Sequence, residues 1–129
     1  SDQLQALKMV GLDDRIAVLP DGIQTRLSST GAPFTVAKMM QLKLAAAILS
    51  EPDILVLSPL FDTVPISRLQ AVFAHLRKLS TTVLYFSNRP EAIVLDGWLW
   101  MGLDRQVLTR DRSIFDALRL PDGEETQHD

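Results

Sequence analysis

Residues 31–59, GAPFTVAKMMQLKLAAAILSEPDILVLSP, decide the fold of this 129-residue chain. Pro33 is excluded from a helix interior and Thr35 is a good N-cap, so the pattern predicts a helix that begins near Val36. Pro52 disfavours a helical conformation in the residue before it, and we therefore expect this helix to end at the acidic-proline segment EPD.

The segment after this helix has the properties of a buried strand. Residues 54–57 have the sequence ILVL, a short, continuously apolar and β-branched run. Such runs are typical of parallel strands that are covered on both faces. Three consecutive alanines at 45–47 let another element approach the preceding helix closely. Together, helix and strand predict an α/β fold.

Further elements are predicted on both sides of this stretch. Helical spacing of apolar residues, β-branched runs and turn residues define them. The predicted helices cover residues 2–10, 15–19, 66–79, 91–95 and 114–118, and the predicted strands cover 82–86, 97–101 and 106–109.

Caps and side-chain alternation add detail to these predictions. Asp62 or Thr63 is expected to cap the helix after the first strand, and Ser113 the last helix. Trp98 and Trp100 alternate with a leucine in a strand, so they are expected to share one face and pack under a helix.

Composition restricts the class of protein. Hydrophobic residues make up 47% of the chain, the formal net charge is −3, and there is no cysteine. A globular core is therefore expected, with no disulfides and no general electrostatic reason to bind nucleic acid. No apolar run approaches the roughly 20 residues that cross a bilayer, and no signal peptide is recognised. Because the chain begins at Ser1 inside a predicted helix, we suspect a piece of a longer protein.

The order of elements resembles the signature-helix-to-Walker-B segment of the ABC transporter ATPases. In that family LSGGQ opens a helix of small residues, an acidic-proline break follows, and an apolar strand ends in Asp-Glu. Here FTVAK at 34–38 stands in place of LSGGQ, and Ser58-Pro59 stands in place of Asp-Glu. The run VGLDDRIAVLPDGIQTRLSSTG at 10–31 resembles the helical subdomain of exporter members, although Pro-Asp-Gly alone is a common turn.

This resemblance implies a fold and a division of the chain. The fold would be part of a P-loop NTPase: a short, mainly parallel sheet with flanking helices and a C-terminal hairpin. Residues 1–50 would be the remnant of the helical subdomain with a degenerate signature helix. Residues 51–120 would be the C-terminal part of the ATPase core, and 121–129 a flexible tail. With the family's Walker A strand missing, 82–86 is expected to pair directly with 97–101, or to pair across a dimer.

The resemblance also implies where nucleotide would be contacted. Thr35, Val36, Ala37 and Lys38 correspond to the signature loop, whose backbone N–H groups approach a γ-phosphate in the family. Val36 and Ala37 replace its two glycines, and they add side chains where phosphate must come close. Lys38 could attract an anion, but a solvated surface lysine is the more common case.

The family's catalytic positions carry other residues here. Ser58 and Pro59 replace the Mg²⁺-organising Asp and the Glu that polarises water, and Asn88 replaces the switch histidine. Pro65 stands at the D-loop aspartate, with Asp62 three residues earlier. No Walker A sequence occurs in the chain. We therefore expect no catalytic residue and no metal site in these residues.

The resemblance implies that this chain is the C-terminal fragment of an ABC transporter ATP-binding domain with a degenerate, non-hydrolytic site. The intact parent would use ATP and Mg²⁺ and couple them to transport. It would sit on the cytoplasmic face of a membrane, with transmembrane domains and a second nucleotide-binding domain as partners. A homodimer of the fragment is a further expectation. The alternative is a stand-alone α/β interaction or regulatory module that has lost nucleotide binding.

Overall fold

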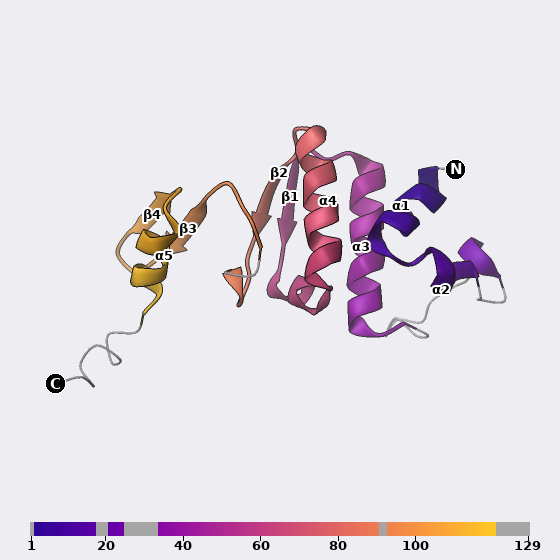
Figure 1. Ribbon diagram of the computed structural model, residues 1–129, viewed down its shortest axis with the longest axis horizontal. Helices are drawn as coiled ribbons and strands as arrows, with labels where there is room; N and C mark the ends of the chain where they lie inside the picture. Colours follow the sequence, from indigo (N-terminus) through magenta and orange to yellow (C-terminus); the bar gives the residue numbers. More distant parts are fainter. Residues whose placement is uncertain (1, 18–20, 25–33, 91–92, 121–129) are drawn as a thin grey trace. The chain divides into compact units, whose positions relative to one another are not determined.

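The computed structural model describes residues 2–17, 21–24, 34–90 and 93–120 of the chain (Figure 1). It shows a small α/β protein whose described elements are five α-helices, a two-stranded parallel sheet and an antiparallel hairpin. The chain divides into two compact units, Ser1–Ile93 and Val94–Asp129. This division does not test the functional boundaries predicted at residues 50 and 120.

The sheet of the first unit confirms that residues 54–57 form a parallel strand. β1 (Ile54–Leu57) and β2 (Thr82–Tyr85) pair in register from Ile54 opposite Thr82 to Leu57 opposite Tyr85. Backbone bonds extend the ladder at both ends, from Thr82 N to the Asp53 carbonyl (2.8 Å) and from Phe86 N to the Leu57 carbonyl (2.9 Å). Helix α4 (Ile66–Lys78) makes the crossover between the two parallel strands.

Helix α3 (Val36–Ser50) begins where the sequence predicts. The Thr35 hydroxyl accepts a hydrogen bond from Lys38 N at 3.3 Å, which satisfies one of the unpaired N–H groups of the first turn. The helix ends at Glu51, whose φ of 47° lies in the left-handed region. Pro52 follows directly and cannot continue the helix, so the chain turns into β1.

The core of the first unit lies between its helices and one face of its sheet. α1 (Asp2–Val10) closes at Gly11, where φ is +83°, and it packs against α3. The buried Gln41 side chain on α3 donates to the Val10 carbonyl at 2.7 Å and so ties the two helices together. Fully or almost fully buried side chains of the core are Leu7, Val10, Leu12, Leu44, Leu57, Val64, Leu69, Val72 and Leu76.

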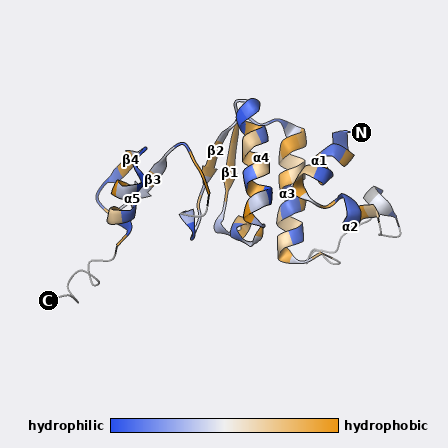
Figure 2. Ribbon diagram, viewed as in Figure 1, coloured by the Kyte–Doolittle hydropathy of each residue, from blue (hydrophilic) through white to orange (hydrophobic). Residues whose placement is uncertain are grey.

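The opposite face of the parallel sheet is exposed, so the prediction that β1 is covered on both faces was wrong. We expected a strand covered on both faces, but Ile54 and Val56 of β1 are 63% and 58% exposed. Leu84 of β2 and Phe86, which follows it, are 46% and 51% exposed. Side chains alternate across a strand, so these four residues share one apolar face. Figure 2 shows both strands as strongly hydrophobic segments.

The second unit is a hairpin with one helix. β3 (Trp98–Met101) and β4 (Gln106–Thr109) pair antiparallel, and α5 (Arg112–Arg119) packs on them. The rings of Trp98 and Phe115 lie 6.5 Å apart, so the predicted packing of Trp98 under a helix is confirmed.

Several local predictions were wrong in detail. The second helix, α2 (Asp13–Ala17), begins at Asp13 rather than at residue 15, and residues 93–95 are not helical. The cap of α5 is Asp111, whose carboxylate binds Ser113. Asp62 caps no helix but lies within a 3-10 helix, η2 (Pro59–Thr63).

The predicted direct pairing of residues 82–86 with 97–101 would join strands of different units and stays a prediction. β2 pairs with β1 and β3 pairs with β4, in two separate sheets. Pairing across a dimer stays a prediction. The predictions for residues 18–20, 25–33, 91–92 and 121–129 lie outside the described residues. In the part of the chain that the structure describes, no helix is both long and apolar enough to cross a membrane.

Candidate functional site

The predicted site residues lie at one end of the first unit. Because β1 and β2 are parallel, their carboxyl ends meet at the same sheet edge, which is where α/β proteins commonly bind ligands. Figure 1 shows α3 running opposite to these strands, so its first turn lies at the same end. η2, which follows β1, packs against α3 at this end.

Ser58 and Pro59 serve local backbone geometry. The Ser58 hydroxyl accepts a hydrogen bond from Leu60 N at 3.3 Å and so caps η2. Pro59 occupies the first position of that 3-10 helix. A serine engaged in a cap and a proline without a polar side chain do not fit Mg²⁺ or the activation of a water molecule.

The segment 35–38, for which the resemblance predicts a contact with phosphate, does not present open N–H groups. The Thr35 hydroxyl is used as the cap of α3. Val36 is 56% exposed and carries its branched side chain at the start of the helix, where the family has glycine. Any anion that approached the first N–H groups of α3 would meet these side chains.

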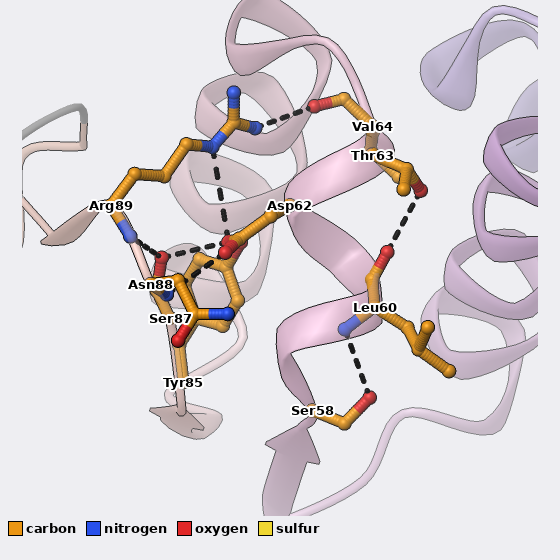
Figure 3. A network of polar contacts seen from close by, with 9 residues as sticks. All are labelled: Ser58, Leu60, Asp62, Thr63, Val64, Tyr85, Ser87, Asn88 and Arg89. Atoms are coloured by element: carbon orange, nitrogen blue, oxygen red, sulfur yellow. Dashed lines mark hydrogen bonds and ion pairs between the residues drawn. The ribbon is translucent and has the colours of Figure 1, made fainter.

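Asn88, which the resemblance places at the switch-histidine position, belongs to a cluster of polar side chains (Figure 3). This cluster was not predicted from the sequence. The Asn88 backbone N–H donates to Asp62 Oδ2 at 2.9 Å. Asp62 Oδ1 accepts hydrogen bonds from the Tyr85 hydroxyl and, at 2.7 Å, from the Ser87 hydroxyl. One carboxylate on η2 therefore accepts hydrogen bonds from three residues, Tyr85, Ser87 and Asn88, at the end of β2.

Arg89 completes this cluster. Its Nε lies 3.8 Å from Asp62 Oδ1, and its Nη2 donates to the Val64 carbonyl at 2.9 Å. The Arg89 backbone N–H donates to the Ser87 hydroxyl oxygen at 3.0 Å. The buried Nε–H makes no hydrogen bond within the part of the chain that the structure describes.

We call the groups that face the Asp62 carboxylate the donor cradle. Each belongs to β2 or to the residues that follow it, and each forms a hydrogen bond or an ion pair with one of the two carboxylate oxygens. The donor cradle consists of the Tyr85 hydroxyl, the Ser87 hydroxyl, the Asn88 N–H and the Arg89 guanidinium.

The electrostatics of the cluster fix its protonation state. Burial of the Asp62 carboxyl opposes its ionisation, but the three hydrogen bonds and the Arg89 charge outweigh this cost and lower the pKa of Asp62. Burial and the hydrogen bond to Asp62 raise the pKa of Tyr85 to about 12. At neutral pH, Asp62 is therefore a carboxylate and Tyr85 a neutral donor.

This arrangement is suited to holding an anion rather than to acid–base catalysis. A general base works best with a pKa near the operating pH, and Asp62 is displaced in the opposite direction. Within the described ranges, no three His, Cys, Asp or Glu side chains are grouped as they would be to hold a metal ion.

Sequence reasoning missed the cluster because its members come from two segments more than 20 residues apart. Asp62 follows β1, and the Ser87-Asn88-Arg89 run follows β2. The usable signal was the parallel pairing itself, which brings the residues after both strands to the same edge.

No protein-family model matches the chain, and a search of curated proteins gives no significant match. The functional interpretation therefore rests on the chain's own residues and their geometry.

Proposed function

We propose that this chain is the C-terminal part of an ABC-transporter-type nucleotide-binding domain whose share of the ATP site is degenerate. The parent would couple ATP to transport, while these residues serve structure or regulation. The observation that carries the proposal is the succession of a Thr35-capped helix, a break at Glu51 and a parallel strand that ends at Leu57. Ser58 and Asn88 follow the two parallel strands at the positions that Walker B and switch residues have in the family.

The exposed apolar face of the sheet supports the proposal. A two-stranded sheet has little independent stability, and its uncovered apolar side chains include Ile54 and Val56. In an ATPase core, further strands and helices from the rest of the domain would cover this face.

Equilibrium binding of Mg-ATP to the intact parent tests this proposal. We expect saturable binding that is unchanged by Ser58→Ala or Asn88→Ala, because these side chains lack the chemistry to hold Mg²⁺ or a γ-phosphate. A parent without a Walker A loop that fails to bind Mg-ATP would contradict the proposal. That result would favour the second candidate, an α/β interaction or regulatory module, for which the exposed sheet face is the supporting observation.

A further inference from the structure

The donor cradle has the geometry of a binding site for a planar, two-oxygen anion. Oδ1 of Asp62 receives the hydroxyls of Tyr85 and Ser87, and Oδ2 receives a backbone N–H. An ionised carboxylate only accepts hydrogen bonds and offers about four acceptor positions, which matches this set of donors. A metal ion or a cationic ligand would meet donors only.

The cradle is held in place by contacts that do not involve the Asp62 carboxylate. The Tyr85 ring packs edge-on against Phe73, with ring centroids 5.8 Å apart. Ser87 accepts the Arg89 N–H, and the Arg89 guanidinium is anchored on the Val64 carbonyl. The donors should therefore keep their positions when the carboxylate is removed.

η2 likewise has hydrogen bonds of its own that do not involve the Asp62 carboxylate. The Ser58 hydroxyl caps its first turn, and the Thr63 hydroxyl donates to the Leu60 carbonyl at 2.8 Å. Asp62 is thus a side chain presented to the cradle by a turn that holds itself together.

One donor of the cradle is not fully used. The buried Arg89 Nε lies 3.8 Å from Oδ1, and its N–H makes no hydrogen bond among the described residues. A charged donor buried without a hydrogen bond is costly. A carboxylate that is not tethered to η2 could move closer and satisfy it.

We propose that the donor cradle is a binding site for the carboxylate group of a small molecule, and that Asp62 occupies it as an internal ligand. This inference goes beyond the proposed function and does not depend on it. A tethered carboxylate competes at a high effective concentration, so an external carboxylate gains access when Asp62 is removed or displaced.

The test is chemical rescue of the Asp62→Ala chain with sodium formate, against sodium chloride at equal ionic strength. We expect 100 mM formate to raise the melting temperature of Asp62→Ala by about 4 °C over chloride, and to shift the Asn88 amide resonance. The unsubstituted chain should show neither effect. Addition of Arg89→Gln to Asp62→Ala should abolish both.

Asp111→Ala is the matched control. Asp111 also accepts an N–H and a hydroxyl, both from Ser113, but it is exposed and no Arg89-like cation faces it in the described contacts. Formate should not stabilise this variant beyond chloride.

Equal melting temperatures of Asp62→Ala in formate and chloride would overturn the proposal. So would a chain that stays unfolded in both salts for Asp62→Ala and for the smaller change Asp62→Ser, because a preformed cradle must survive loss of its internal ligand. Folding in formate but not in chloride would support it.

Discussion

Asp62 is a partly buried residue, and its contacts in the folded state favour the ionised carboxylate. Three hydrogen bonds and the nearby Arg89 lower its pKa, so its contribution to stability is present above the ordinary value of 3.8. The contribution is lost as the pH falls through the lowered pKa of the folded state. The charge that accepts these hydrogen bonds thus makes the stability of the first unit sensitive to acid.

Asp62→Asn should lower the free energy of unfolding at pH 7 by about 2 kcal/mol, because hydrogen bonds to a charged acceptor are lost. The difference from the unsubstituted chain should shrink as the pH falls below 3.8. Urea unfolding at pH 7 and pH 3 measures both quantities. Asp53→Asn, at an exposed residue before β1, is the control and should have little effect. A difference independent of pH would contradict this explanation.

Tyr85 responds to pH in the opposite range. Its pKa is raised from 10.0 to about 12 by burial and by the hydrogen bond to Asp62. The neutral phenol therefore stabilises the folded state fully below pH 10, and this contribution disappears as the pH rises toward 12. Tyr85→Phe should remove the loss of stability over this range, as followed by urea unfolding. A Tyr85→Phe chain with the same alkaline profile as the unsubstituted chain would show that the phenol is not responsible.

Among the helices and strands, the correct predictions were those that depended on residues close together in the sequence. Thr35 as a cap and Pro52 as a breaker fixed both ends of α3, and the apolar run at β1 was also correct. Asp62 was misassigned because a capping side chain and one that bridges to β2 look alike in sequence. The exposed sheet face was not foreseen, because an apolar run does not reveal what covers it.

Thr35→Ala tests the N-cap of helix α3. Loss of the hydrogen bond to Lys38 N should lower the free energy of unfolding by about 1 kcal/mol, a typical cost of an N-cap. Ser50→Ala in the last turn of the same helix is the matched control. The exposed Ser50 hydroxyl donates to the Ala47 carbonyl, and water can replace this hydrogen bond. Equal effects of the two substitutions in urea unfolding would argue against a capping role for Thr35.

At the scale of the whole molecule, the open apolar face of the parallel sheet predicts self-association of the isolated chain. Val56→Lys places a charge on a side chain that is 58% exposed, and it should weaken association without unfolding the first unit. Leu108→Lys, on the hairpin at 78% exposure, is the control. Sedimentation over a range of concentrations measures the effect. A chain that is monomeric at all concentrations would contradict self-association through this face. Equal effects of the two substitutions would contradict it as well.

The most direct measurement of the central claim is Mg-ATP turnover by the intact parent, compared with its Ser58→Ala and Asn88→Ala variants. We expect the same rate in all three proteins, because Ser58 caps η2 and the Asn88 backbone N–H donates to Asp62. A fall of about 10²-fold in either variant, typical for loss of a transition-state contact, would contradict it.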